Sequence, residues 1–243
     1  MDKTVLITGA AGGIGQAIAK RFAAEGYQVV LHYNTNSEGA MTLKKTLEKT
    51  GANVFVSGAD LKDPAAVDRL LEALQNHHIH VDVLINNAGI KADGPIDEMA
   101  DATFTDVLRT NVEGPWFLIK RLVPAMKEKG FGRIINITSG VAKEGRANQT
   151  NYAASKAALE NLSKSLAREL GPYGITANAV APGLIMTPMT ADVPEAQKEA
   201  YIDKVPIKRL VEAEDVAHAC AFFADERSGA ISGQIIGVNG GLR

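Results

Sequence analysis

Residues 5–15 read Val-Leu-Ile-Thr-Gly-Ala-Ala-Gly-Gly-Ile-Gly and join a short apolar run to a helical pattern. The apolar residues 5–7 are typical of a parallel strand that is buried on both faces, and Ile14, Ile18 and Phe22 recur at helical spacing. In a strand–turn–helix unit the glycines let the backbone approach a phosphate, and the helix N-terminus attracts its charge. The stretch therefore predicts a dinucleotide-binding α/β fold, although a plain tight turn would carry the same glycines and bind nothing.

The segment after the second predicted strand bears on which dinucleotide binds. Residues 28–33 form that strand, and residues 32–37 (His-Tyr-Asn-Thr-Asn-Ser) contain no Asp or Glu that could hold a ribose 2′-hydroxyl. A 2′-phosphate would meet no fixed negative charge there, but no Arg or Lys is present to bind it either. We expect NADP(H) to be preferred over NAD(H), and Asn34 to contact the cofactor.

Apolar strands and amphipathic helices alternate through the rest of the chain. We expect strands at residues 53–57, 81–85, 132–138, 175–180 and 234–238, and helices at 38–49, 64–75, 152–170 and 214–223. The helix around Asn111 should bend at Gly114-Pro115, because a proline disrupts a helix interior. No linker or repeat breaks this pattern, which predicts one α/β domain over residues 1–243: a doubly wound parallel sheet of about seven strands with helices on both faces, a Rossmann fold.

Three polar residues gather around the end of the fifth strand. Ser139 lies where that strand ends, and the four-residue spacing of Tyr152 and Lys156 puts both on one face of the next helix. An adjacent ammonium favours the phenolate, and lowering the tyrosine pKa from about 10 to about 7 is worth roughly 4 kcal/mol. The pair is a candidate general acid, and the alternative is a packed tyrosine beside a solvated lysine. Asn111 is either a satisfied buried amide or part of the same site.

Composition and charge argue against several classes of protein. The 243 residues carry a net charge of −2, so neither nucleic acid nor a membrane is an expected partner. The single cysteine, Cys220, lies in an apolar helical pattern and should be buried, and a reducing, cytoplasmic location is the default. His77, His78 and His80 lack nearby carboxylates, so we expect no metal site. Residues 184–208 are expected to form a mobile lid with an apolar lining.

Together these motifs resemble those of the short-chain dehydrogenase/reductase family, and especially its 3-oxoacyl-[acyl-carrier-protein] reductases of fatty acid biosynthesis. The match covers essentially the whole chain and follows the family order: Thr8-Gly9-x-x-x-Gly13-x-Gly15, Asn86-Asn87-Ala88-Gly89, Asn111, Ser139, Tyr152-x-x-x-Lys156 and Pro182-Gly183. Their joint occurrence is far more specific than any one motif.

The resemblance implies a role for each residue of the site. Tyr152 would give a proton to a carbonyl oxygen as NADPH delivers hydride to its carbon, and Lys156 would lower the pKa of Tyr152 and bind the nicotinamide ribose. Ser139 would orient the carbonyl, and Asn111 would support a water chain that returns protons to Lys156. Asp60 would contact the adenine. The implied cofactor site consists of Gly9, Gly12, Gly13, Ile14, Gly15, Asn34, Asp60, Leu61, Asn87, Ala88, Gly89, Tyr152, Lys156, Pro182, Gly183, Ile185 and Thr187.

The expected reaction is NADPH-dependent reduction of a 3-oxoacyl thioester, linked to acyl carrier protein or coenzyme A, by a homotetramer. Two alternatives remain, namely a dehydrogenase/reductase of a sugar, polyol or small ketone, and a regulator that senses nucleotide without turnover. Two features depart from the family pattern. Gly12 stands where many NADPH-dependent relatives carry Arg or Lys, and Tyr173 weakens the basic surface that Lys127 and Lys129 would offer to the carrier protein beside the site mouth.

Overall fold

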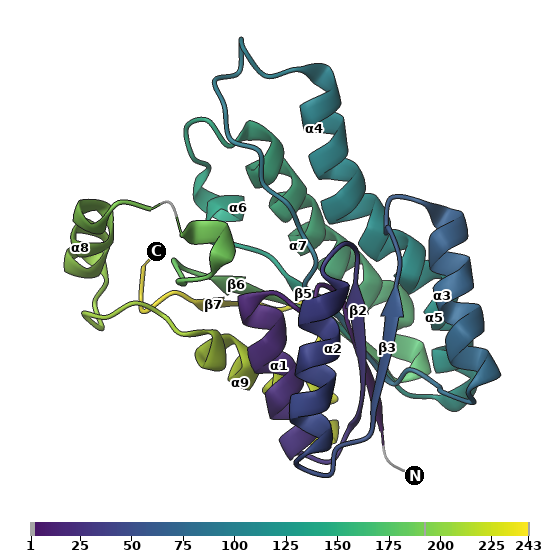
Figure 1. Cartoon of the computed structure of the whole chain (residues 1–243). Coiled ribbons are helices and arrows are strands. Elements are labelled where there is room, and N and C mark those ends of the chain that lie inside the picture. Colours follow the sequence, from purple (N-terminus) through teal and green to yellow (C-terminus); the bar gives the residue numbers. More distant parts are fainter. Residues whose placement is uncertain (1–2, 192, 243) are drawn as a thin grey trace.

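Seven parallel strands form one sheet, in the order β3-β2-β1-β4-β5-β6-β7, in the computed structural model, which describes residues 3–191 and 193–242 (Figure 1). The predicted doubly wound sheet is confirmed. The order in which strands are added reverses between β1 and β4, and ligands bind outside the carboxyl ends of the strands at such a switch point. The strands are β1 (Thr4–Ile7), β2 (Gln28–Tyr33), β3 (Val54–Gly58), β4 (Val83–Asn86), β5 (Gly132–Ile137), β6 (Ile175–Pro182) and β7 (Ile235–Val238).

Helices cover both faces of the sheet (Figure 1). One face carries α1 (Gly13–Ala24), α2 (Ser37–Glu48) and α9 (Ala213–Ala224), and the other carries α3 (Pro64–Asn76), α5 (Gly114–Lys129) and α7 (Thr150–Leu170). Three further helices are α4 (Asp101–Leu108), α6 (Val141–Glu144) and α8 (Glu195–Lys204), and α8 projects to the left in Figure 1. The short helix α6 was not among the predicted helices, because four residues are too few to show a helical period.

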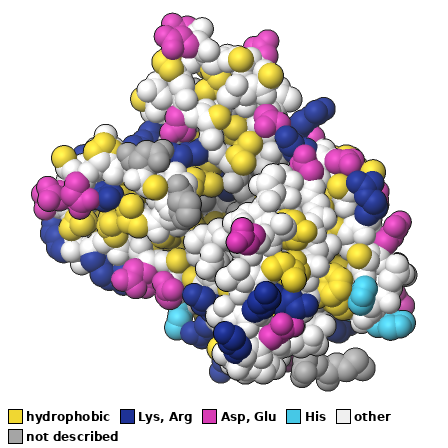
Figure 2. Space-filling model, in the orientation of Figure 1, with side chains coloured by type: hydrophobic (Ala, Val, Ile, Leu, Met, Phe, Trp, Pro, Cys, Tyr) yellow, Lys and Arg dark blue, Asp and Glu magenta, His cyan; other side chains and the backbone are white. Residues whose placement is uncertain are grey.

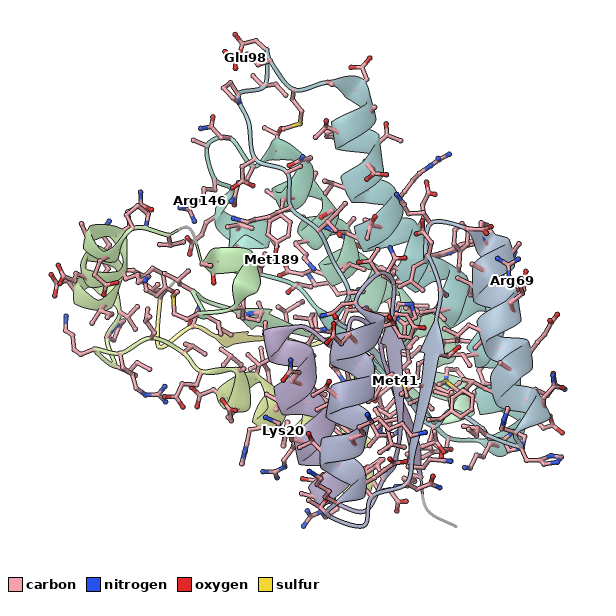
Figure 3. All side chains as sticks on the ribbon, in the orientation of Figure 1. Lys20, Met41, Arg69, Glu98, Arg146 and Met189 are labelled. Atoms are coloured by element: carbon pink, nitrogen blue, oxygen red, sulfur yellow. The ribbon has the colours of Figure 1, made fainter. Side chains whose placement is uncertain are left out.

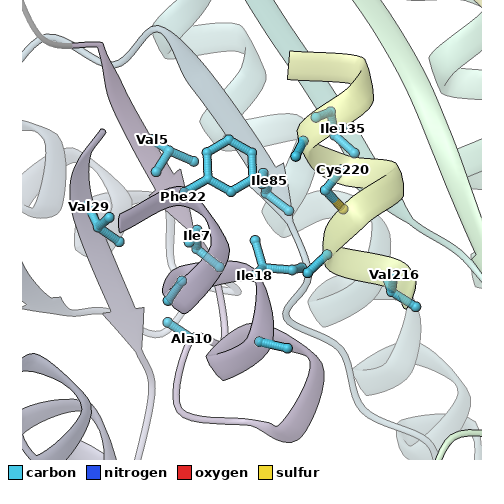
Figure 4. Packing of buried hydrophobic residues seen from close by; sticks show 14 of the residues in the cluster. Val5, Ile7, Ala10, Ile18, Phe22, Val29, Ile85, Ile135, Val216 and Cys220 are labelled. Carbon is cyan, nitrogen blue, oxygen red and sulfur yellow. The ribbon is translucent and has the colours of Figure 1, made fainter. Parts of the chain in front are cut away.

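Alternate strand residues supply two separate cores. Val5 and Ile7 of β1 point to the α1, α2 and α9 face, whereas Leu6 points to the α3, α5 and α7 face. Figure 4 shows the first of these cores, where Phe22 from α1 and Cys220 from α9 pack over the sheet and are fully buried. The predicted burial of Cys220 is confirmed. These cores hold the strands rigid beneath the loops at their carboxyl ends.

The helix around Asn111 is irregular close to the predicted position. A π-helical turn, η1 (Arg109–Glu113), joins α4 to α5 without a break in the helical backbone, and Pro115 follows this turn directly. The predicted irregularity near Gly114-Pro115 is therefore found as this π-helical turn, and the bend itself stays a prediction. The π-helical turn directs Asn111 inward, where it is completely buried.

Candidate active site

A cavity of about 870 Å³ opens at the carboxyl edge of the sheet. Its walls come from the glycine-rich turn after β1, the ends of β2, β4, β5 and β6, and the segment from Gly183 to Tyr201. In Figure 2 the surface is hollowed between the lobe that contains α8 and the central body. This is the edge at which open α/β sheets bind dinucleotides.

Most of the predicted site residues come together in this cavity. Gly15, Asp60, Leu61 and Asn111 lie outside its lining. Gly15 is required by the geometry of the glycine-rich turn, because a Cβ there would lie 2.5 Å from the Gly9 carbonyl oxygen. The predicted residues in the lining are Gly9, Gly12, Gly13, Ile14, Asn34, Asn87, Ala88, Gly89, Ser139, Tyr152, Lys156, Pro182, Gly183, Ile185 and Thr187.

Asp60 and Leu61 are engaged elsewhere in the fold. One carboxylate oxygen of Asp60 accepts the backbone N–H of Lys62 at 3.0 Å. Leu61 is buried in the α3, α5 and α7 core, and a Cβ on Gly114 would lie 2.8 Å from the Leu61 Cβ. Neither residue forms part of the cavity wall.

The glycine-rich turn is fastened to the end of β4. Gly9 has φ +63°, which only glycine adopts freely, and a Cβ there would lie 2.9 Å from the Cα of Ala88. The hydroxyl of Thr8 accepts the N–H groups of Asn87 (3.0 Å) and Ala88 (2.9 Å). In return the Asn87 amide donates to the carbonyl oxygens of Thr8 (2.9 Å) and Gly9 (3.1 Å). The turn is thus preformed for close approach by a ligand phosphate.

A buried histidine also holds this turn, and sequence reasoning missed it. His32 Nδ1 accepts the N–H of Gly9 at 3.3 Å, so Nε2 carries the proton and donates to the carbonyl oxygen of Ala59 at 3.0 Å. Burial lowers the pKa of His32 to about 4, so the ring is neutral at pH 7. The signal in the sequence was a histidine at an inward position of an apolar strand.

Lys156 and Tyr152 lie side by side, as their spacing predicts. Lys156 Nζ is buried, donates to the carbonyl oxygen of Ile137 at 2.8 Å, and lies 5.5 Å from the centroid of the Tyr152 ring. Burial lowers the pKa of Lys156 to about 8. Burial also raises the pKa of Tyr152, a hydrogen bond with Ser139 lowers it, and the charge of Asp93 raises it further. The predicted lowering of the Tyr152 pKa is therefore wrong for this structure, because desolvation of the phenolate outweighs the favourable contacts.

Asn111 is a buried amide whose oxygen and nitrogen are both hydrogen-bonded, as one of its two interpretations expects, and its part in the site stays a prediction. Its Oδ1 accepts the N–H of Ile90 at 2.8 Å, and its Nδ2 donates to the Ile90 carbonyl oxygen (2.9 Å) and to Ser155 Oγ (3.0 Å). Ser155 Oγ in turn donates to the carbonyl oxygen of Tyr152 at 2.7 Å. Asn111 therefore ties the segment after β4 to the first turn of α7, which carries the tyrosine.

A second polar group lies in the cavity beside the tyrosine and was not predicted. Gln149 Nε2 donates to a carboxylate oxygen of Asp93 at 2.9 Å, and Lys91 Nζ lies 3.8 Å from the same carboxylate. Tyr201 of α8 also lines the cavity, where its hydroxyl accepts the N–H of Leu184 at 2.9 Å. Single polar residues in loops carry no periodic signal, so the sequence alone could not assign these contacts.

The basic residues expected beside the mouth lie at the opposite edge of the sheet. Lys129 forms an ion pair with the buried Asp82, which immediately precedes β4, at its amino end. Lys127 Nζ lies 4.2 Å from the centroid of the Tyr173 ring. The cavity opens at the carboxyl ends of the strands, so the expectation that Lys127 and Lys129 flank it within one chain is wrong.

Residues 3–191 and 193–242 contain neither a metal-binding cluster nor a membrane-spanning helix. In that part of the chain no group of three or more His, Cys, Asp or Glu side chains could hold a metal ion. Nor does any helix there have the length and apolar character needed to cross a membrane.

Comparison with known proteins agrees with the fold and the motifs. A family model described as enoyl-(acyl carrier protein) reductase matches residues 9–243. The 3-oxoacyl-[acyl-carrier-protein] reductase FabG of Pseudomonas aeruginosa is 41% identical over 240 residues, which are 99% of this chain and 97% of that protein.

Two solved structures share the whole fold. A putative gluconate dehydrogenase from Agrobacterium tumefaciens superposes with a TM-score of 0.95 at 28% identity, covering 98% of this chain and 95% of its own. Levodione reductase superposes with a TM-score of 0.93 at 33% identity, covering 99% and 97%. From its sequence motifs, its sheet and these relatives, the chain belongs to the short-chain dehydrogenase/reductase family of oxidoreductases.

Proposed function

We propose that the protein reduces a 3-oxoacyl thioester, carried by acyl carrier protein or coenzyme A, to the 3-hydroxyacyl thioester with NADPH. The observation that carries this proposal is the meeting of Ser139, Tyr152 and Lys156 in one cavity with the glycine-rich turn. The 41% identity to a 3-oxoacyl-[acyl-carrier-protein] reductase supports the choice of substrate.

The three polar side chains suit the reduction of a carbonyl group. Bound NADPH supplies the hydride. Tyr152 is protonated at neutral pH because its pKa is raised, so its phenol can give a proton to the carbonyl oxygen. Ser139 can donate a hydrogen bond to the same oxygen as negative charge develops on it. With a pKa of about 8, Lys156 is mostly charged at pH 7, and this charge stabilises the phenolate that remains.

The cavity wall fits a dinucleotide. A Cβ on Gly13 would lie 2.9 Å from the Thr187 methyl group, so only glycine leaves room between the turn and the residues after β6. Gly12 and Gly13 would approach the pyrophosphate, Asn34 would face the adenosine ribose, and Lys156 would bind the nicotinamide ribose. The lack of a carboxylate in residues 32–37 supports NADPH over NADH.

A sugar, polyol or small ketone is the second candidate substrate. Asp93 and Gln149 place a polar pair beside Tyr152, which suits hydroxyl groups. The names of the two structural neighbours point the same way, since one is a putative gluconate dehydrogenase and the other a levodione reductase.

The assembly we propose is a cytoplasmic homotetramer. Trp116 on α5 is 45% exposed and Phe104 on α4 is 36% exposed, which leaves large apolar side chains on this face of one chain. Light scattering should give four times the 25.8 kDa chain mass. A mass of one chain would refute the tetramer.

The proposed function is tested by initial rates with NADPH and NADH across acetoacetyl thioesters, a cyclic diketone and a set of polyols. We expect the highest kcat/KM for an acetoacetyl thioester with NADPH. A higher value for a diketone or polyol would assign the second candidate. Cofactor binding without turnover of any substrate in the panel would indicate a nucleotide sensor.

A further inference from the structure

Three cationic side chains line the cavity, and two of them are already engaged. Lys156 is buried against the carbonyl oxygen of Ile137, and Lys91 lies 3.8 Å from the carboxylate of Asp93. The third, Arg146, is exposed at the rim and forms no side-chain hydrogen bond or ion pair with any residue in the ranges 3–191 and 193–242. Its guanidinium is therefore open to a ligand.

The loop that carries Arg146 is held in place on the carboxyl side of that residue. The backbone carbonyl oxygen of Arg146 accepts the N–H of Gln149 at 3.1 Å, and the Gln149 side chain donates a hydrogen bond to Asp93. Gly94 donates its N–H to the carbonyl oxygen of Asn148 at 2.8 Å, and Asn148 adopts φ +62°, which asparagine tolerates. Figure 3 shows Arg146 in the gap between α6 and α8. The cation is thus displayed on a fixed part of the rim.

Charged side chains of both signs line the cavity, and they differ in whether they already have a partner. Near Tyr152 neither cation is open to a substrate anion, because Lys91 Nζ lies 3.8 Å from the Asp93 carboxylate and Lys156 Nζ donates to the carbonyl oxygen of Ile137. Glu144 also lies in the lining, and its charge acts on Tyr201 of α8. Only Arg146 offers an open cation in the described lining, whereas Lys129 is paired at the far edge of the sheet. A substrate with its anion distant from the carbonyl matches this layout.

We propose that Arg146 determines specificity by binding an anionic group that the substrate carries away from its carbonyl. The inference rests on the proposed function, under which this group is the phosphate of the pantetheine arm that carrier protein and coenzyme A share. A carboxylate on a keto acid presents the same chemistry to a guanidinium. Substrates that carry either the phosphate or the carboxylate, each compared with its uncharged counterpart, distinguish these two anions.

The test compares kcat/KM within matched pairs of substrates. One pair is acetoacetyl phosphopantetheine and acetoacetyl pantetheine, and the other is 4-oxopentanoate and its methyl ester. We expect the natural chain to prefer the phosphorylated thioester by about 3- to 10-fold, through KM, because the guanidinium is exposed and partly screened. In Arg146→Ala this ratio should fall to about one, in Arg146→Lys an intermediate ratio should remain, and added salt should reduce the preference.

Lys143→Ala is the matched control, because Lys143 is an exposed cation three residues earlier that is absent from the lining. This variant should keep the natural ratio. A preference only in the keto acid pair, lost in Arg146→Ala, would assign the carboxylate as the anion. Equal rates within both pairs, or a phosphate preference that survives in Arg146→Ala, would overturn the inference while leaving thioester reduction intact. Failure of the natural chain to reduce either thioester would instead refute the proposed function.

Discussion

Tyr152 and Lys156 have pKa values shifted in opposite directions by the same cause. Burial favours the neutral form of each side chain, so the phenol keeps its proton and the amine loses its proton more easily. A proton donor for carbonyl reduction needs the protonated phenol, and the amine needs to be charged when the proton has left. Both conditions hold together below about pH 8.

Replacing the proposed proton donor tests its role directly. Tyr152→Phe removes only the hydroxyl, so we expect kcat to fall by about 10²- to 10⁴-fold, the usual contribution of a general acid. NADPH affinity, measured by calorimetric titration, should stay within a few-fold of the natural value. Turnover of the best substrate at the natural rate would show that another group supplies the proton.

The pH profile of reduction should decline on its alkaline side near pH 8. Lys156 is charged below its pKa of about 8 and neutral above it, whereas Tyr152 remains protonated through this range because its pKa is raised. The decline therefore belongs to the lysine. We would measure kcat/KM from pH 6 to pH 10, and compare Lys156→Arg, whose guanidinium stays charged. A decline at the same pH in an active Lys156→Arg variant would contradict this assignment.

At the scale of elements, the π-helical turn η1 acts through Asn111. Asn111→Leu keeps the volume but leaves the N–H and C=O groups of Ile90 without their partner. We expect the free energy of unfolding to fall by about 2 kcal/mol, and kcat by about ten-fold or more as the segment after β4 shifts. Urea denaturation and steady-state rates would measure both effects. Asn76→Leu, at the exposed end of α3, is the matched control and should change neither.

The sequence predicted strands and long helices well because their burial repeats with a fixed period. The strand Gln28–Tyr33 agrees at both ends with the prediction, and α7 begins two residues before the predicted Tyr152. The π-helical turn was not predictable, since its inserted residue leaves the apolar pattern on either side unchanged. Helix α6, of four residues, is too short to show a helical period.

At the scale of the whole molecule, the cavity joins segments that are far apart in sequence. The gathering of Gly9, Asn87, Ser139 and Tyr152 was predictable, because parallel strands bring their carboxyl ends to one edge. The sign of the Tyr152 pKa shift was not, since burial depends on every segment packed around the ring. The predicted catalytic and cofactor roles, and the single domain over residues 1–243, stay predictions.

Because the cofactor would contact the glycine-rich turn, α7 and the segment after β6 together, its binding should stabilise the whole chain. At one hundred times its dissociation constant a ligand adds about 2.7 kcal/mol, or roughly 5–10 °C in Tm for a chain of this size. We expect a larger rise with NADPH than with NADH at equal concentration, measured by calorimetry. An equal or larger rise with NADH would contradict the proposed preference.

Cys220 of α9 is buried in the core that α9 forms with α1, and its thiol can serve as an internal chemical probe. The thiol is completely enclosed and its pKa is raised, so alkylating reagents should leave the native chain unmodified. Labelling would then proceed only through molecules that have opened the core, and its rate in excess reagent would report how often they open. A single-cysteine chain thus allows conformational opening to be timed by mass spectrometry without engineering a reporter.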